Sequence, residues 1–298
     1  MADESSIGKR LYKFKSFDFL LYIFMIILSL IVLYPFLYLI ALSFNQGTDA
    51  IRGGITVFPR KFTMENYRMI FENRSMLHGL FISISRTLVG TAVTMVFTIL
   101  ASYCFTKRDM VGYKFYLWIF LIPMYIAAGI IPTYLVYKTM GITNNFLVYI
   151  IPNLVWGSNI IIMRTLFDDV PKSLAESAFM DGAGDMTIIY KVIVPLSLPV
   201  IATIALFNAV WQWNSWFDTM LFTRSKDLDT LMSLLSQMLL QNQSQQLAVA
   251  KANNRMQNIT PEVLKAAMTM ITVMPIVLVY PFLQKYFIKG IMVGAVKE

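Results

Sequence analysis

The sequence predicts an all-α polytopic membrane protein with about six transmembrane helices and a cytoplasmic helix-turn-helix. Hydrophobic residues make up 57% of the chain and charged residues 14%, a balance too apolar for an ordinary soluble domain. Apolar runs of about 18 or more residues recur, each long enough to cross a hydrocarbon core about 30 Å thick. A polar stretch that interrupts these runs, residues 170–195, supplies the predicted helix-turn-helix.

The apolar runs define the predicted spans. The first run is about twice as long as the core of a signal peptide, so we expect an uncleaved span. Prolines inside the runs predict kinks, which neighbouring helices tolerate by satisfying the freed carbonyl groups. The predicted spans cover about 17–44, 77–105, 113–137, 146–167, 196–222 and 264–287 of one transmembrane domain, 1–298, with external segments 45–76 and 223–263.

Charge and motifs limit the function classes. The formal net charge of +8 does not indicate nucleic-acid binding, because the basic residues are scattered along the chain. They are modestly enriched in the segments predicted to lie on the cytoplasmic side, which include both termini. No P-loop, G-x-G-x-x-G or H-E-x-x-H motif occurs, so we expect no ATP site and no enzyme activity in this chain. The single histidine, His78, has no metal-ligand spacing around it. The single cysteine, Cys104, is predicted to pack within an apolar run.

The polar stretch 170–195 divides into two predicted short helices. Apolar residues at spacings of three and four predict a helix over 172–180. Asp181 and Gly182 begin the turn D-G-A-G, because aspartate favours turns and glycine adopts left-handed conformations at little cost. A second helix is predicted over 185–194.

This stretch resembles the EAA loop of ABC-importer permeases, a cytoplasmic helix-turn-helix that docks into a cleft of the ATPase subunit. The family pattern is Glu-Ala-Ala, three residues, Gly, nine residues, Ile, one residue and Leu-Pro. At those positions this chain has Glu176-Ser177-Ala178, Gly182, Val192 and Val194-Pro195. The departures from the pattern are Ser177 for alanine, Val192 for isoleucine and Val194 for leucine, all exchanges between small or apolar residues. An ordinary polar loop is the alternative interpretation, which the number of matching spacings disfavours.

The resemblance implies an ATPase-docking role for the first short helix and the turn. Glu176 is expected to bind an arginine or a backbone N–H of the ATPase through charge-assisted hydrogen bonds, and the alternative is a solvated charge at a helix end. One apolar face, formed by Leu174, Ala178 and Phe179, is expected to fill the ATPase cleft. The predicted docking residues are Leu174, Glu176, Ser177, Ala178, Phe179, Asp181 and Gly182.

Beyond this loop the chain resembles the carbohydrate branch of these permeases, of the maltose-transporter type, and relatives that import oligosaccharides derived from polysaccharides. P-R-K-F-T-M-E-N-Y at 59–67, W-x-W-N at 211–214 and the closing F-I-K-G-I-M-V-G-A-V-K-E carry this resemblance. It implies a cytoplasmic (inner) membrane of a prokaryote and a second, homologous permease subunit. It also implies two cytoplasmic ATPase subunits that carry ATP and Mg, and an extracellular solute-binding protein.

Residues 208–218 in the fifth predicted span are the candidate contact for sugar. Indole rings stack on the apolar faces of pyranose rings, and amide side chains bond to hydroxyl groups. For Trp213 and Trp216 the alternative is an aromatic belt at the membrane interface. Arg86 is predicted to face other protein or a water-filled cavity, with a snorkelling arginine as the alternative. The predicted substrate-pathway residues are Asn208, Trp211, Asn214, Asn153, Trp156 and Arg86.

Sugar import by alternating access is therefore the predicted function. An importer of amino acids, peptides or phosphate is the alternative within the class and would be favoured by charges in the cavity. A secondary transporter or channel would need ion-coupling acids within its spans, and Asp218, close to a span end, is a poor candidate. A membrane enzyme is disfavoured because no span carries paired carboxylates or metal ligands.

Overall fold

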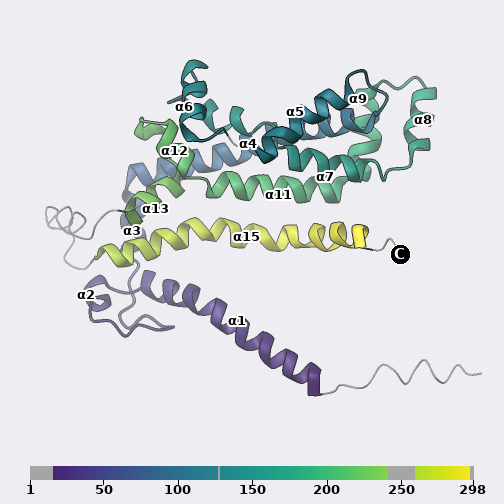
Figure 1. The fold of residues 1–298 in the computed structure, drawn as a ribbon. Coiled ribbons are helices and arrows are strands. Elements are labelled where there is room, and N and C mark those ends of the chain that lie inside the picture. The colour runs from purple at the N-terminus through teal and green to yellow at the C-terminus, as the bar shows by residue number, and fades with distance from the viewer. Residues whose placement is uncertain (1–15, 127, 241–258, 296–298) are drawn as a thin grey trace, which may run out of the picture. The chain divides into compact units, whose positions relative to one another are not determined.

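The computed structural model describes residues 16–126, 128–240 and 259–295, and these residues are predominantly helical (Figure 1). Within this part of the chain the only extended pairing is an isolated antiparallel bridge between Asn45 and Phe62. The predicted all-α fold class is therefore confirmed. The basic N-terminal segment, the middle of the predicted external segment 223–263 and the last three residues fall outside the described residues.

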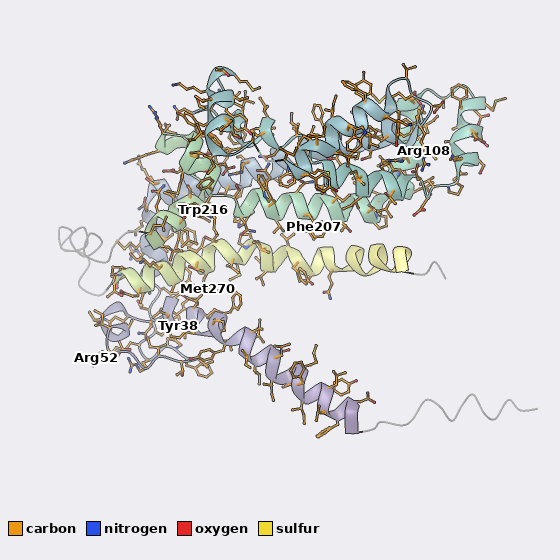
Figure 2. The ribbon with its side chains drawn as sticks, in the orientation of Figure 1. Tyr38, Arg52, Arg108, Phe207, Trp216 and Met270 are labelled. Carbon is orange, nitrogen blue, oxygen red and sulfur yellow. The ribbon has the colours of Figure 1, made fainter. Side chains whose placement is uncertain are left out.

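The chain divides into two compact units, 1–70 with 242–270 and 71–241 with 271–298. The helix α15 (Pro261–Ala295) contributes to both units. Besides part of α15, the first unit contains α1 (Ser16–Ser43), α2 (Gly47–Ala50) and α3 (Glu65–Glu72), the last of which ends just past the unit's boundary. Helix α1 is long and apolar, and its side chains are mostly exposed (Figure 2).

A buried polar cluster follows the end of α1 in the first unit. Asn45 donates from Nδ2 to Asp49 Oδ2 at 3.1 Å, and its Oδ1 accepts the Lys61 backbone N–H at 2.9 Å. Arg60 Nε pairs with Asp49 Oδ2 at 3.0 Å, and Asn66 Nδ2 donates to the Asn45 carbonyl at 3.0 Å. The hydrogen bond from Asn45, with the help of Arg60, lowers the pKa of Asp49 even though desolvation opposes the shift. These bonds fix the chain where it leaves α1.

The second unit contains most of the helices. Its longest complete helix, α4 (Arg74–Thr106), is capped by Asn73, whose Oδ1 accepts the Ser75 N–H at 3.0 Å. The other helical elements are α5 (Tyr113–Tyr125), α6 (Ile130–Thr139), the 3₁₀ turns η2 (Phe146–Tyr149), η3 (Ile151–Asn153) and η5 (Lys226–Leu228), α7 (Gly157–Phe167), α8 (Lys172–Met180), α9 (Asp185–Ile188), the π-helix η4 (Ile189–Ile193), α10 (Val194–Leu196), α11 (Leu198–Asn214), α12 (Phe217–Phe222) and α13 (Leu231–Leu240).

Helix α4 is the centre of the second unit, because α7, α11 and α13 all pack against it. Small hydroxyl residues along α4 bond to these neighbours. Thr94 Oγ1 donates to the Asn153 carbonyl at 3.0 Å, and Ser102 Oγ donates to the Ile160 carbonyl at 3.1 Å. Polar side chains on this apolar helix are therefore used for helix packing.

Three described helical stretches are long and apolar enough to cross a membrane: 18–43, 74–106 and 261–281. They overlap the first, second and sixth predicted spans. The fourth predicted span, 146–167, corresponds to two helical stretches that meet at a bend of 50°. With a second bent pair described below, up to five spans lie within the described residues, and the chain has the character of a multi-pass membrane protein.

Two predicted spans differ from the structure. The range 113–137 is divided between α5 and α6, because Ile126 after α5 is extended and Gly129 before α6 adopts a φ of 80° that a right-handed helix does not allow. The range 196–222 is interrupted between α11 and α12, where Ser215 is extended. Residues 185–196, expected to precede the span, form its bent partner and meet α11 at 87°. Hydropathy does not detect the break near Gly129, where the sequence stays apolar, whereas the break at Ser215 lies among the polar residues Gln212, Asn214 and Asp218.

Candidate functional site

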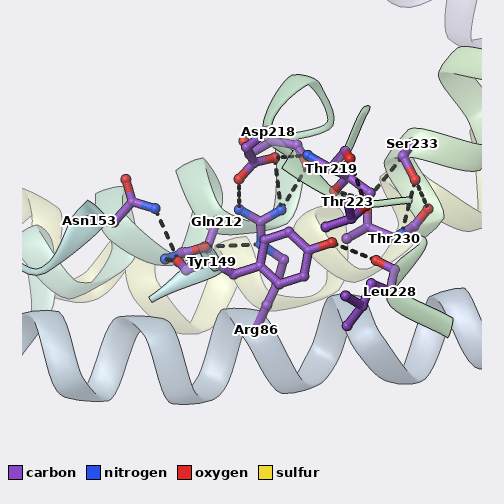
Figure 3. A network of polar contacts seen from close by, with 11 residues as sticks. Arg86, Tyr149, Asn153, Gln212, Asp218, Thr219, Thr223, Leu228, Thr230 and Ser233 are labelled. Carbon is purple, nitrogen blue, oxygen red and sulfur yellow. Dashed lines mark hydrogen bonds and ion pairs between the residues drawn. The ribbon is translucent and has the colours of Figure 1, made fainter. Parts of the chain in front are cut away.

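Arg86, on α4, is fully buried and its charge is completely surrounded by partners (Figure 3). Its Nε donates to Gln212 Oε1 at 3.0 Å, and its two Nη atoms donate to the Asp218 carboxylate at 3.2 and 2.5 Å. It also donates to the Ser215 carbonyl at 3.3 Å and lies over the Tyr149 ring, 4.3 Å from the centroid. A buried charge is tolerated when it is paired and hydrogen-bonded, and Arg86 meets both conditions.

The approach of Gln212 to Arg86 depends on Gly90, one turn along α4. A Cβ atom on Gly90 would lie 2.5 Å from Gln212 Nε2, so only glycine leaves room for this amide. Gln212 Nε2 in turn donates to the Tyr149 carbonyl at 3.1 Å. The Ser215 carbonyl lies in the break between α11 and α12, where its bond to Arg86 satisfies it. The network therefore stabilises this break.

Gln212 and Asp218 belong to the predicted sugar-contact stretch 208–218, but neither they nor Tyr149 are among the named substrate-pathway residues, and their pairing with Arg86 was not predicted. Asp218 is dismissed as an ion-coupling acid in the sequence prediction, and the structure gives it a different role as the counter-ion of Arg86. The signal that could have identified the pair is an opposite charge in another span, since an intramembrane arginine requires a partner. Gln212 and Tyr149 carry no comparable signal.

A cavity of about 1070 Å³ lies in the second unit between α4, α11, α12 and residues 275–280 of α15. Its wall is largely aromatic and aliphatic, and no Asp, Glu, Lys, Arg or His is among the described residues that line it. The size and the apolar wall with a few polar groups are typical of a small-molecule site. Its polar and aromatic lining residues include Thr87, Thr91, Trp211, Asn214, Trp216 and Tyr280.

Two predicted substrate-pathway residues, Trp211 and Asn214, line this cavity. Trp211 is 37% exposed, and its ring meets that of Trp156 edge to face, with centroids 5.1 Å apart. Trp213 is buried and donates from Nε1 to the Thr272 carbonyl at 2.9 Å, so its role includes packing. The fold thus brings an aromatic surface together on one side of the cavity.

The other four predicted residues do not line the cavity: Trp156 is half-buried, and Asn153, Asn208 and Arg86 are buried. Asn153 donates from Nδ2 to the Tyr149 carbonyl at 3.1 Å. Asn208 Oδ1 accepts from Asn159 Nδ2 at 3.4 Å. Arg86 is held in the network described above. The polar groups of these residues connect helices of the bundle to one another.

The predicted helix-turn-helix is present as α8, a turn and the run from α9 to α10. Gly182 has a φ of 83°, the left-handed conformation that the turn requires. Leu174 and Phe179 are 44% and 68% exposed, whereas Ala178 packs against the chain's own apolar core. Ala178 is half-buried, so the apolar face is shared between the core and the surface, and its docking role stays a prediction. The remaining predicted docking residues, Glu176, Ser177, Asp181 and Gly182, are exposed.

The structure also places the single cysteine and the single histidine of the sequence. Cys104, predicted to pack in an apolar run, is exposed near the end of α4, which corrects that prediction. His78 Nε2 lies 2.8 Å from the Asp227 carbonyl oxygen. Among the described residues, no three His, Cys, Asp or Glu side chains are grouped so that they could hold a metal ion.

Comparison with known proteins gives relatives along nearly the whole chain, although no family model matches it. The chain is 34% identical over 286 residues to the polygalacturonan/rhamnogalacturonan transport system permease protein YtcP of Bacillus subtilis (strain 168), covering 96% of this chain and 99% of that protein. It is 36% identical over 269 residues to protein LplC of the same organism, covering 90% of each. Its structure resembles a chain of a bacterial ABC transporter involved in the import of the acidic polysaccharide alginate, with a TM-score of 0.84, 27% identity, and coverage of 91% and 96%.

Proposed function

This chain belongs to the permease subunits of ABC sugar-transport systems, and from that premise we propose that it forms half of the membrane pathway of an ATP-driven oligosaccharide importer. A second, homologous permease subunit forms the other half. Two cytoplasmic ATPase subunits, which carry ATP and Mg, dock beneath the pair, and an extracellular solute-binding protein delivers the sugar. Both termini lie in the cytoplasm of a prokaryotic cell.

The observation that carries the sugar assignment is the lining of the 1070 Å³ cavity. Trp211 presents an indole ring that suits the apolar face of a pyranose, and Asn214 presents an amide beside it. An apolar wall with few polar groups suits a solute that combines hydroxyl groups with apolar ring faces. An importer of phosphate or amino acids would be favoured by charged residues at this wall, and no observation on the described residues favours that alternative.

Alternating access supplies the mechanism. ATP binding closes the two ATPases and moves the docking segments, residues 170–195 of each permease, toward each other. The spans then tilt from an inward-facing to an outward-facing arrangement, and the site near the membrane midplane receives sugar from the binding protein. Such a population shift requires ATP to bind the closed state more tightly than the open one.

Uptake of labelled oligosaccharides tests the sugar assignment. Cells that depend on this chain are given neutral oligosaccharides, fragments of polygalacturonan, or phosphate. We expect uptake of at least one oligosaccharide, and a loss of about fivefold for Trp211→Ala, since a ring-stacking contact is worth about 1 kcal/mol beyond its buried area. The matched control is Trp118→Ala, because Trp118 on α5 is 61% exposed and does not line the cavity. Uptake of phosphate alone would overturn the sugar assignment.

Co-purification tests the docking role of Glu176. The tagged chain is isolated from its native membrane, and the proteins that accompany it are identified. We expect an ATPase and a second permease with the wild type, and loss of the ATPase with Glu176→Arg, which reverses an exposed charge on α8. The control reverses another exposed carboxylate, in Asp109→Arg. A wild-type chain that purifies alone would argue for a secondary transporter.

A further inference from the structure

The loop between α4 and α5 contacts the chain just before α8 and just after it. Lys107 Nζ forms a short ion pair with Asp185 Oδ1, at the start of α9. Its neighbour Arg108 pairs through Nη2 with Asp168 Oδ2 at 3.3 Å, at the end of α7. Arg108 lies at the same end of the second unit as α8 and α9 (Figures 1 and 2). Two consecutive basic residues thus hold the chain on either side of α8.

Additional contacts fix the orientation of these ion pairs. The Tyr103 hydroxyl, from the last turns of α4, donates to Asp185 Oδ1 at 2.8 Å, and Lys107 Nζ lies over the Tyr103 ring, 5.0 Å from the centroid. Arg164 Nε lies 3.7 Å from Asp168 Oδ2. Asp185 therefore has two donors that both belong to the end of α4.

A shared apolar core lies beneath these polar contacts. Tyr103, Phe167, Ile188 and Ile189 are all buried in one cluster, which joins the ends of α4 and α7 to α9 and the π-helix. The small residues Ala175, Ala178 and Ala183 of the docking segment pack against the same cluster. The docking segment is consequently attached to this chain along its inner side, while Phe179 and Met180 remain exposed on the outer side.

We propose that Lys107, Arg108, Asp168 and Asp185, together with Tyr103, form a clamp that transmits movement of the docking segment to α4. Asp185 is the central positioning residue, because it joins α9 to the end of α4 through two side chains. This inference rests on the proposed function, since it assigns a coupling role to a segment proposed to dock onto the ATPase. Movement of α4 would reach the cavity directly, because Thr87 and Thr91 on this helix line it.

The strength of the clamp comes from its combination of contacts. The side chains of Lys107 and Asp185 are 46% and 59% exposed, and exposed ion pairs contribute little individually. The hydrogen bonds from Lys107 and Tyr103 lower the pKa of Asp185, so its carboxylate is charged throughout the neutral pH range. A few weak bonds that converge on one carboxylate restrict how α9 can rotate relative to α4, even though each bond adds little to the stability of the fold.

The single cysteine of the chain supplies a reporter for this movement. Cys104 is exposed on α4 directly beside Tyr103, so a spin label or fluorophore there senses the end of α4. The labelled chain is assembled with cysteine-free ATPase and partner permease in nanodiscs, and the signal is compared with and without ATP. We expect Asp185→Asn to retain the ATPase and to lose most of the ATP-dependent change in the signal.

Two controls separate coupling from structural damage. Asp109→Asn removes an exposed carboxylate from the same α4–α5 loop and should leave the ATP response unchanged. The exchanged pair Lys107→Asp with Asp185→Lys should recover the response. If Asp185→Asn fails to assemble, Lys107→Gln tests the same ion pair from outside the docking segment.

The outcomes distinguish the clamp from the proposed function. An unchanged ATP response in Asp185→Asn or Lys107→Gln, with the ATPase bound, would overturn the clamp and leave the proposed function intact. Failure of the exchanged pair to recover any response would also count against the clamp. If the wild-type chain retains no ATPase at all, the proposed function itself is overturned.

Discussion

The two ion pairs at α4 occupy opposite environments. Arg86 and Asp218 have side chains that are 0% and 16% exposed, whereas Lys107 and Asp185 are 46% and 59% exposed. A buried charge that loses its partner is costly, while an exposed charge is simply solvated by water. The comparison suggests a division of labour along one helix. The buried pair maintains the fold around the break between α11 and α12, and the exposed pair connects α9 to the end of α4 while adding little to the stability of the fold.

Breaking the buried pair should have the largest effect. Arg86→Met leaves the Asp218 carboxylate without its counter-ion, and we expect the free energy of unfolding to fall by about 3–5 kcal/mol. Thermal unfolding of the detergent-purified chain measures this loss. The double variant Arg86→Met with Asp218→Asn removes the unpaired charge, so it should be more stable than the single variant. If Arg86→Met were as stable as wild type, the buried pair would not be what maintains the fold around the break between α11 and α12.

A glycine substitution tests the same network without removing a charge. Alanine at Gly90 would place Cβ against Gln212 Nε2 and force the amide away from Arg86 and Tyr149. Overpacking of this kind costs about 1–3 kcal/mol, partly offset by the higher helix propensity of alanine, about 1 kcal/mol. The same unfolding measurement applies. Gly184→Ala is the control, because no atom lies within 4 Å of its added Cβ. An equal change in the free energy of unfolding in the two variants would mean that Gln212 moves aside without cost.

The exposed pair should have the smallest effect on stability. Asp185→Asn is expected to cost less than about 1 kcal/mol at neutral pH. Because contacts with Lys107 and Tyr103 lower the pKa of Asp185 in the folded chain, the stabilisation is complete above the usual aspartate pKa of about 3.9. It is lost as the pH falls further, through the lowered pKa of the folded state. The melting temperatures of wild type and variant should therefore converge in acid; a difference independent of pH would contradict this assignment.

The fold was predictable to the extent that local sequence determines it. Long apolar runs identify α1, α4 and α15, and a left-handed glycine identifies the turn at Gly182. The break at Ser215 was not predicted, because Gln212, Asn214 and Asp218 around it were interpreted as sugar-contacting residues within one continuous span. Its cause lies outside the segment, in the guanidinium of Arg86 that binds the Ser215 carbonyl.

The candidate site was predictable in part for a similar reason. Trp211 and Asn214 lie on the cavity wall, as the mixture of indole and amide groups suggested. Asn208 and Asn153 have the same chemical character but face neighbouring helices, and sequence gives no direct measure of which side of a buried helix faces a cavity. Ala178 illustrates the same limit on a helix of only nine residues, where the apolar side is divided between the core and the surface.

The buried pair also has a consequence for biosynthesis. Asp218 follows Arg86 by 132 residues, so at ribosomal rates of about 5–20 residues per second the counter-ion is made on the order of ten seconds later. During that interval α4 carries an unpaired guanidinium, whose insertion at the centre of a helix costs about 3 kcal/mol on translocon scales. The apolar residues of α4 must offset this cost until α12, which carries Asp218, has been made.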